Sequence, residues 1–484
     1  MLFNSLTYLF FLLVVVLVLY LIPSKSQWLW LLIASVFFYY TLSPIYLVLF
    51  CSLVIINYLL GLTIERNNAT RNIVFLIGIG INILVLVFFK YVGFFQVLTN
   101  QIIGLSESDP ILSIVLPVGL SFFVFTVLSY LIEVKRGAIQ AERNLGIFAS
   151  SLLFFPKMMQ GPIERPDHIF PQFKEAKHFD YDGIVEGLKL MLWGYFKKLV
   201  IADRMALYVN AVYDNYEHHS GLSLLVATFI YAFQIYADFS GYTDIALGSA
   251  RILGFNLTDN FKRPYFATSI QDFWNRWHIT LSMWLRNYLF FPLAVVMAGK
   301  LRHTKYLGLE ADKWIFMIAS IITFSVCGLW HGEGLNFLLW GLLFGTYLTI
   351  ANWTLGLSKY MRKKLGISKS STLYRVYGIG ITYLLVSFAW ILFRADTTND
   401  AINIIKSISS LSGPLFIVRR TLIFSMIGLG ILIFVDAKRE FGLFGNLTFN
   451  PKFKIIEHLK YVTLILIILL IGVFDGGQFI YFKF

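Results

Sequence analysis

Long apolar stretches recur along the whole chain and are separated by short polar connections. A helix that crosses the hydrocarbon core of a bilayer needs about 20 mainly apolar residues. The stretches that approach or exceed this length are residues 3–22, 28–42, 45–62, 73–97, 111–132, 222–237, 314–330, 335–353, 376–393, 422–435 and 461–474. The pattern predicts an all-α integral membrane protein with about eleven transmembrane helices, within roughly two. We expect a single polytopic domain over residues 1–484.

Four further stretches are apolar but contain proline, glycine or charged residues: 146–160, 186–213, 241–257 and 279–298. The first belongs to a proline-rich region with Pro156, Pro162, Pro166 and Pro171. Irregular backbone at membrane depth persists only where it is buried in protein or lines a wet cavity. We therefore predict interfacial, re-entrant or broken helices in these four stretches. The proline-rich part is predicted to line a central cavity, and its amphipathic continuation to lie in the interface.

Basic residues are distributed unevenly over the connections between the first five apolar stretches. The basic connections carry Lys25, then Arg66 and Arg71, then Lys135, Arg136 and Arg143. The alternate connections, residues 43–44 and 98–110, carry no lysine or arginine. Because cytoplasmic loops are enriched in these residues, the pattern predicts an extracytoplasmic N-terminus. The run from Leu6 to Ile22 lacks a basic start and a small-residue cleavage site, so we expect a retained first span and not a signal peptide.

Only 14% of the 484 residues are charged, compared with about 25% in soluble domains. This composition excludes the soluble, disordered and fibrous classes. The formal net charge is +13, from 40 basic and 27 acidic residues. The basic residues are scattered through short loops, which favours contact with anionic lipid and excludes a nucleic-acid-binding face. Cys51 and Cys327 lie in apolar runs, which predicts neither a disulfide framework nor a metal site.

Two of the eight histidines lie where an ionisable side chain is costly. The first, His331, stands between Trp330 and Gly332, with long apolar runs on both sides. Residues 314–353 would form a helix about 60 Å long at 1.5 Å per residue, so we predict a break at Gly332 and Gly334. A histidine at this break is either a core residue bonded to a carbonyl or a catalytic residue. Burial keeps an imidazole neutral, which suits a general base for a hydroxyl.

The second histidine, His278, closes a segment rich in charged and aromatic residues. Asp272 and Arg276 are four residues apart in this segment, which predicts an intrahelical ion pair. The alternative is that the segment lines a substrate passage. The candidate residues for such a passage are Asp272, Trp274, Arg276, Trp277, Trp330 and Asn336.

Two carboxylates, Asp238 and Asp244, flank Gly241, where we predict another helix break. We expect them to pair with arginine residues between helices, or alternatively to relay protons or ions. The chain contains no Walker A loop, GxGxxG, CxxC or GxSxG motif. The sequence therefore indicates no ATPase, no nucleotide-binding fold and no standard serine hydrolase.

The Trp330-His331-Gly332 motif in an apolar helix, preceded by residues 272–282, resembles the membrane-bound O-acyltransferase (MBOAT) family, and within it the alginate-type O-acetyltransferases. The resemblance extends in order over roughly residues 115–484. Its other segments are residues 129–137, 155–156, 160–163, 238–244, 260–265, 393–395 and 479–482.

The resemblance implies an acyltransferase with many helices around a central funnel or tunnel. His331 would then be catalytic, either deprotonating the acceptor hydroxyl or carrying the acyl group transiently. His278 would position the acceptor or donate a hydrogen bond to the oxyanion. The implied donor is acetyl-CoA or another acyl thioester, with no covalently bound cofactor and no metal. The implied location is the bacterial cytoplasmic membrane.

The implied partners are a polysaccharide acceptor and an extracytoplasmic protein of the SGNH-hydrolase type that relays the acyl group. Two alternatives remain open from the sequence. One is D-alanyl transfer from an acyl-carrier protein to teichoic acid. The other is a transporter or flippase for polysaccharide or lipid intermediates, because broken helices and buried charges also occur in transporters.

Overall fold

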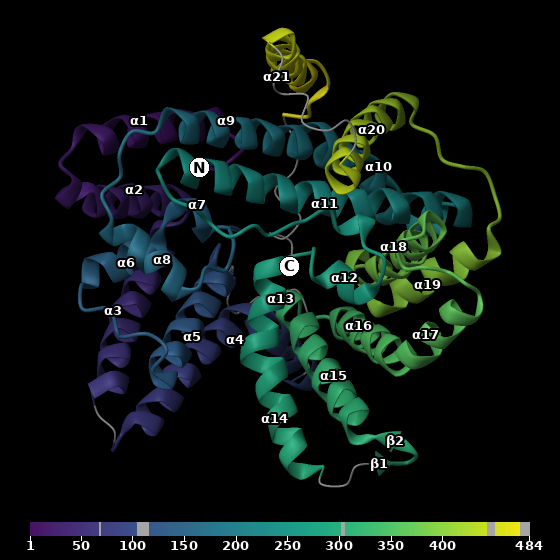
Figure 1. Ribbon diagram of the computed structural model, residues 1–484, viewed down its shortest axis with the longest axis horizontal. Coiled ribbons are helices and arrows are strands. Elements are labelled where there is room, and N and C mark those ends of the chain that lie inside the picture. Colours follow the sequence, from purple (N-terminus) through teal and green to yellow (C-terminus); the bar gives the residue numbers. More distant parts are fainter. Residues whose placement is uncertain (67–68, 104–115, 302–304, 443–450, 475–484) are drawn as a thin grey trace. The chain divides into compact units, whose positions relative to one another are not determined.

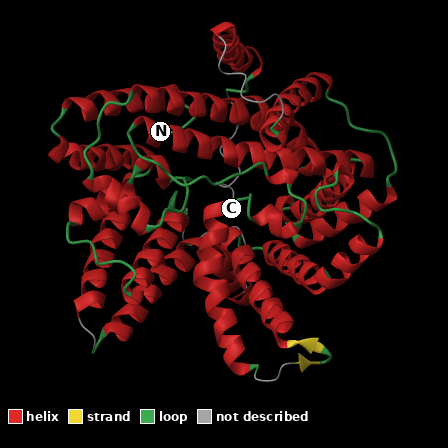
Figure 2. Cartoon of the chain, in the orientation of Figure 1, coloured by secondary structure: helices red, strands yellow, loops and turns green. Residues whose placement is uncertain are grey.

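The computed structural model describes residues 1–66, 69–103, 116–301, 305–442 and 451–474. These residues are mostly helical, as Figures 1 and 2 show, which confirms the predicted all-α class. In the described part of the chain, two strands of two residues each, β1 (Lys305–Tyr306) and β2 (Leu309–Glu310), pair antiparallel. The start of the predicted stretch 111–132 and the motif at 479–482 lie outside the described residues.

The described chain divides into two compact units. The first contains Met1–Met191 and Tyr242–Thr258. Its elements are α1 (Leu6–Leu21), η1 (Ser24–Ser26), α2 (Gln27–Leu42), α3 (Pro44–Arg66), α4 (Arg71–Ile103), α5 (Leu120–Arg136), α6 (Leu145–Leu153), α7 (Phe155–Met158), α8 (Pro166–Lys174) and most of α9 (Tyr181–Tyr195). The predicted organisation as a single functional domain stays a prediction.

The second unit contains Leu192–Gly241 and Asp259–Phe484. Its elements are η2 (Phe196–Ala202), α10 (Asp203–Tyr213), η3 (Tyr216–His218), the larger part of α11 (Gly221–Ile252), η4 (Pro264–Phe266), α12 (Ile270–Trp274), α13 (Ile279–Leu285), η5 (Arg286–Phe290), α14 (Phe291–Lys300), β1, β2, α15 (Ala311–His331), α16 (Leu335–Trp353), α17 (Leu355–Lys364), α18 (Thr372–Arg394), α19 (Thr398–Ser410), α20 (Arg419–Phe441) and α21 (Pro451–Ile471).

Among the described residues, eight helices are long and apolar enough to cross a membrane. They are Pro44–Arg66, Arg71–Gly93, Gly221–Ile252, Ile279–Lys300, Ala311–His331, Leu335–Trp353, Thr372–Arg394 and Arg419–Phe441. Two shorter apolar helices cover Leu6–Leu21 and His458–Ile471. Together they fall within the predicted range, and the protein is a multi-pass membrane protein.

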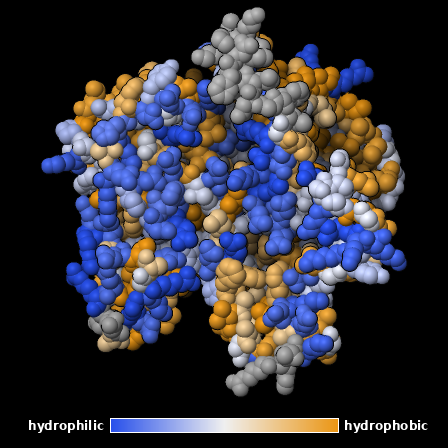
Figure 3. All heavy atoms as spheres, viewed as in Figure 1, coloured by the Kyte–Doolittle hydropathy of each residue, from blue (hydrophilic) through white to orange (hydrophobic). Residues whose placement is uncertain are grey.

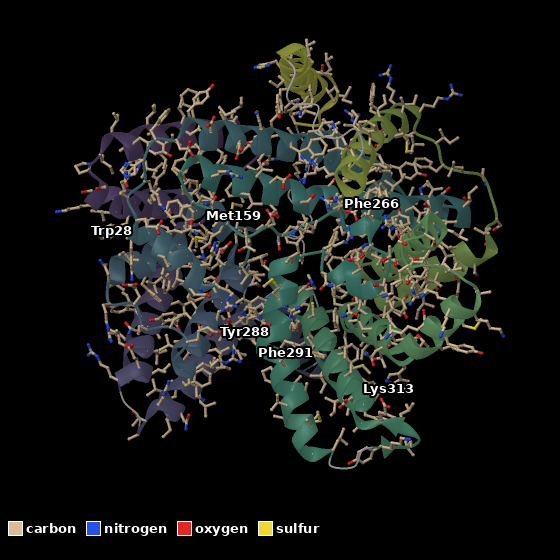
Figure 4. The ribbon with its side chains drawn as sticks, in the orientation of Figure 1. Trp28, Met159, Phe266, Tyr288, Phe291 and Lys313 are labelled. Atoms are coloured by element: carbon tan, nitrogen blue, oxygen red, sulfur yellow. The ribbon has the colours of Figure 1, made fainter. Side chains whose placement is uncertain are left out.

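The outward faces of the spans are apolar. On α14, for example, Val295 is 72% exposed and Phe291 is 51% exposed. Figure 3 shows hydrophobic surface over this helix, and Figure 4 shows Phe291 close to Tyr288 of η5. Exposed apolar faces of this size are unusual in soluble monomers, and they suit contact with lipid tails.

The helix break predicted at Gly241 is wrong, because α11 runs unbroken from Gly221 to Ile252. A Cβ added at Gly241 would lie 2.9 Å from the Gly194 carbonyl oxygen and 3.1 Å from the Lys198 nitrogen. The glycine therefore permits a close approach between two helices. The sequence pattern could not distinguish this use of glycine from a break.

Residues 186–213, predicted to form an interfacial, re-entrant or broken helix, are helical without a gap, and the π-helical segment η2 joins α9 to α10. A second π-helical segment, η5, joins α13 to α14. Such segments occur mostly as single turns inside α-helices, frequently at functional sites. In the first unit, a small, partly open pocket lies beside the proline-rich region, lined by Phe122, Phe123, Thr126, Leu152, Lys157, Met158 and Pro162.

Candidate active site

The centre of the candidate site is a helical hairpin in the second unit. Helix α15 ends at His331 and α16 begins at Leu335, so the break predicted at Gly332 and Gly334 is confirmed. The two helices pack closely, because a Cβ added at Gly328 would lie 2.2 Å from the Phe337 carbonyl oxygen. The break thus places His331 at the connected end of a tightly packed pair of spans.

The His331 side chain is buried, with 5% of the residue exposed. Its ring lies against three aromatic rings, at centroid distances of 4.6 Å to Trp330, 5.1 Å to Trp340 and 5.2 Å to Phe393. All three contacts are tilted or edge-on, which is the favoured geometry for aromatic pairs. The aromatic enclosure restricts the orientations that the imidazole can adopt. Trp340 and Phe393 are parts of this enclosure that the sequence did not indicate.

Asn336, predicted to line a substrate passage, holds two helices together. Its Nδ2 donates hydrogen bonds to the carbonyl oxygens of Leu392, at 3.1 Å, and Ala395, at 2.9 Å. These carbonyls lie at the C-terminal end of α18, where backbone acceptors need partners. The contact holds the end of α18, and with it Phe393, beside the start of α16.

The second predicted histidine, His278, reaches the same aromatic group. It is 1% exposed and directly precedes α13. Its ring centroid lies 4.7 Å from that of Phe239 and 6.4 Å from that of Trp330. Trp330 therefore contacts both predicted histidines. Burial lowers the pKa of His278 to about 3, so the ring is neutral near pH 7.

The predicted ion pair between Asp272 and Arg276 is confirmed, with a distance of 2.8 Å between Oδ1 and Nε. Arg276 also contacts Glu440 of α20 at 3.0 Å, and the same carboxylate binds Arg263 at 2.7 Å. This group is partly exposed and joins α12 to the end of α20. Phe266, labelled in Figure 4, adds an edge-on contact with Phe441 at 5.7 Å.

The two predicted tryptophans, Trp274 and Trp277, pack inside the second unit. Trp274 lies 4.9 Å from Phe324 of α15, between ring centroids, and Trp277 lies 5.2 Å from Trp390 of α18. In the described part of the chain, the buried indole nitrogens of Trp274 and Trp340 have no hydrogen-bond acceptor. An unsatisfied buried donor costs about 1–3 kcal/mol.

Asp238 pairs with a lysine, and the predicted arginine partner is wrong. Lys198 Nζ lies 2.7 Å from Asp238 Oδ1 and 2.8 Å from Asp203 Oδ1, and all three residues are buried. The π-helical turn η2 carries this lysine. Burial raises the pKa of Asp203 to about 7, with repulsion from Asp238 adding to the shift and Lys198 opposing it.

In this multi-pass membrane protein, a buried histidine thus lies at a break between two apolar helices, beside a second buried histidine. Residues 152–367 match the model of the membrane-bound O-acyltransferase family. The chain is 34% identical to the probable alginate O-acetylase AlgI of Pseudomonas aeruginosa over 408 residues, which are 83% of this chain and 73% of that protein. The chain belongs to the membrane-bound O-acyltransferase family, and it is an O-acyltransferase.

Two further relatives differ in their named substrates. A peptidoglycan O-acetyltransferase of Helicobacter pylori is 32% identical over 413 residues, covering 80% of this chain and 74% of that protein. A teichoic acid D-alanyltransferase of Bacillus subtilis is 27% identical over 277 residues, covering 57% of this chain and 68% of that protein. These relatives are acyltransferases, which disfavours the transporter interpretation of the sequence.

Proposed function

We propose that this enzyme transfers an acetyl group from a thioester donor on the cytoplasmic side to a hydroxyl group on the other side of the membrane. The reaction serves O-acetylation of a cell-surface or exported polysaccharide. The observation that carries this proposal is the buried His331 at the break of a spanning hairpin. The named reactions of the Pseudomonas and Helicobacter relatives support the acetyl group and the polysaccharide acceptor.

A site within the membrane suits a reaction whose donor and acceptor lie on opposite sides of the membrane. Acetyl-CoA carries phosphate charges that cannot enter hydrocarbon without a large desolvation cost. The acetyl group is small and uncharged, so the protein can pass it on while CoA stays in the cytoplasm. His331 removes the proton of the acceptor hydroxyl or takes the acetyl group onto its own ring. His278 positions the acceptor, and the indole N–H of Trp340 is available to the acyl oxygen.

The partners follow from the same proposal. The first acceptor is a hydroxyl on an extracytoplasmic protein of the SGNH-hydrolase type, which passes the acetyl group to the polysaccharide. The enzyme lies in the bacterial cytoplasmic membrane with its N-terminus outside. The proposed transfer uses no resident cofactor, and acetyl-CoA is its donor substrate.

The test is transfer of radiolabelled acetyl from acetyl-CoA in proteoliposomes, with deacetylated alginate oligomers or peptidoglycan fragments and the extracytoplasmic partner supplied. We expect His331→Ala to reduce transfer by at least about 100-fold. The matched control is His218→Ala, at an exposed histidine outside the site, which should retain wild-type transfer. Near-normal transfer by His331→Ala would remove the catalytic role.

D-alanyl transfer is the second candidate, favoured by the match to the Bacillus subtilis D-alanyltransferase. It uses the same thioester chemistry but requires an acyl-carrier protein at the cytoplasmic face. Release of free CoA from acetyl-CoA, compared with turnover of D-alanyl-carrier protein, separates the two. The lower identity and the smaller share of this chain that is covered make acetyl transfer the better-supported reaction.

A further inference from the structure

Lys157 of α7 is a buried lysine whose charge has no partner within the described structure. The other buried lysines of the described chain, Lys177, Lys197 and Lys198, each contact a carboxylate or a hydroxyl group. Lys157 is 4% exposed, and among the described residues its ammonium makes no hydrogen bond or ion pair. A buried charge without a partner is costly. This lysine is therefore a candidate for binding a negative charge that the chain itself does not supply.

The carboxylate of Glu164 acts on Lys157 but does not neutralise it by contact. Glu164 is fully buried and lies 2.6 Å from His168 Nδ1 and 3.2 Å from the Thr258 hydroxyl oxygen. Burial lowers the pKa of Lys157 to about 8, and the charge of Glu164 opposes part of this shift. The side chain of Lys157 is therefore still mainly an ammonium at pH 7, which allows it to attract an anion.

Lys157 lines the small, partly open pocket of the first unit, together with Phe122 and Phe123 of α5. A close approach between α5 and α7 shapes this pocket. A Cβ added at Gly119, which has φ of 82°, would lie 2.3 Å from the Met158 carbonyl oxygen. Glycine at this position thus allows the start of α5 to reach the backbone of α7. The lysine and the start of α5 are brought to the same pocket as a result.

The end of α5 that reaches the pocket is its positive end. Helix α5 has 17 residues and begins at Leu120, so Phe122 and Phe123 belong to its first turn. Its N-cap, Gly119, makes no side-chain capping hydrogen bond, and the first turn contains no acidic residue. The N-terminus of a helix carries a partial positive charge and presents backbone N–H groups, which together favour anions such as phosphate. Two independent positive features therefore meet at this pocket.

Two polar side chains close to Lys157 in sequence are also buried without partners. A hydrogen bond of 3.0 Å from the Gly161 nitrogen to the Lys157 carbonyl oxygen closes a turn that contains Gln160 and Met159, the latter labelled in Figure 4. Gln160 is 3% exposed, and within the described structure neither atom of its amide group has a hydrogen-bond partner. The same holds for the hydroxyl of Ser151 in α6. Since buried polar groups are normally satisfied, this segment fits the binding of a polar ligand.

We propose that Lys157 and the first turn of α5 form a binding site for a phosphate group. Lysine is a common phosphate-binding residue, and helix N-termini bind phosphate through their backbone. The aromatic walls formed by Phe122 and Phe123 suit the uncharged part of a molecule that carries the phosphate. Two sources share this chemistry, namely a phospholipid headgroup and the phosphates of CoA. The proposal does not depend on the acyl transfer proposed above.

The first experiment measures binding to the full-length enzyme by native mass spectrometry from detergent. The probes are phosphatidylglycerol and CoA, with diacylglycerol and pantetheine as their phosphate-free counterparts. We expect wild-type enzyme to bind at least one phosphate-bearing probe in preference to its counterpart, and Lys157→Met to bind it at least about tenfold more weakly. The matched control is Lys25→Met, at an exposed lysine of the same unit, which should bind as wild type does.

The probe that binds identifies the source of the phosphate group. Binding of phosphatidylglycerol indicates a lipid site, and binding of CoA indicates a site for the soluble thioester donor. The proposal is overturned if wild-type enzyme binds neither probe, if the phosphate-free counterparts bind equally well, or if Lys157→Met binds as tightly as wild type. None of these measurements requires acyl transfer, so failure of the proposed function would leave them unaffected.

The second experiment compares melting temperatures of delipidated enzyme in detergent. Lys157→Met replaces an unpaired buried charge with an apolar side chain of similar length, so without ligand its melting temperature should exceed that of wild type by about 2 °C or more. A saturating concentration of the bound probe should then stabilise wild type more than the variant. A lysine with a purely structural role would instead lower the melting temperature when it is replaced. A less stable Lys157→Met in the absence of ligand would therefore overturn the proposal.

Discussion

His331 and His278 are held by different kinds of contact. His331 is enclosed by aromatic rings, which restrict it by packing. His278 is also held by a hydrogen bond, because its Nδ1 lies 3.2 Å from Oδ1 of Asn260.

A third histidine, His168 of α8, lies outside the site and gives a prediction about stability. Its Nδ1 lies 2.6 Å from Oε2 of the buried Glu164, which also binds the Thr258 nitrogen and hydroxyl. The hydrogen bond with Glu164 raises the pKa of His168 above its ordinary value of 6.5, with burial opposing part of the shift.

A histidine whose pKa is higher in the folded than in the unfolded protein stabilises the fold. This stabilisation is complete at pH values below the pKa of the unfolded protein, and it is lost as pH rises through the pKa of the folded protein. We therefore expect the melting temperature in detergent to fall as pH rises from about 6.5 through the raised pKa of His168. The His168 side chain is 44% exposed, so its share is at most about 1 kcal/mol. His168→Gln should remove this component, and an identical pH dependence in that variant would contradict the assignment.

At the scale of elements, the α15–α16 hairpin depends on glycine at its contact face. A Cβ added at Gly341 would lie 2.1 Å from the Phe324 carbonyl oxygen and 3.2 Å from Ser325 Cα. Backbone atoms cannot move aside as a flexible side chain can. Gly341→Ala should therefore push the two helices apart and reduce both stability and activity, at a cost of about 1–3 kcal/mol.

The matched control is Gly380→Ala in the middle of α18. Within the described structure, no atom lies within 4 Å of a Cβ added at Gly380. Alanine is preferred over glycine in a helix interior by about 1 kcal/mol, so this variant should be neutral or slightly stabilised. The melting temperatures of the two variants in detergent are compared, with the folded protein that remains after heating measured by size-exclusion chromatography. Equal stability of Gly341→Ala and Gly380→Ala would show that the hairpin does not need the close approach.

The π-helical turn η2 is a second element whose geometry brings distant residues together. It brings Lys198 to both Asp203 and Asp238, which are 5 and 40 positions away in sequence. Removing one partner from a buried ion pair costs about 3–5 kcal/mol, because it leaves an uncompensated charge. This group explains why charged residues are retained in segments that otherwise resemble spans.

For the whole molecule, the orientation in the membrane decides from which side each substrate enters. The distribution of basic loops predicts an extracytoplasmic N-terminus and a cytoplasmic loop after α5. In a background with Cys51 and Cys327 replaced by alanine, we expect Asn4→Cys to react with a membrane-impermeant maleimide in intact cells. Ala138→Cys, exposed in the loop after α5, should react only after the membrane is permeabilised. The reverse pattern would invert the proposed direction of acyl transfer.

Several parts of the site could be predicted from the sequence. The break at Gly332 and Gly334 followed from the length of the apolar run, and the Asp272–Arg276 pair followed from helical spacing. Other contacts could not be predicted. Glu440 binds Arg276 across 164 positions, and Asn260 binds His278 across 18 positions that include η4 and α12. No local periodicity relates such residues.

The sequence by itself determined the membrane character, the helical class, the hairpin break and the two histidines, because apolar run length and the cost of buried ionisable groups are local properties. Only the tertiary structure decided that Trp330 contacts both histidines, that Asn336 donates hydrogen bonds to the end of α18 and that Gly241 lies inside a continuous helix. These outcomes depend on which helix faces meet. That choice is made by the close packing of side chains from distant parts of the chain.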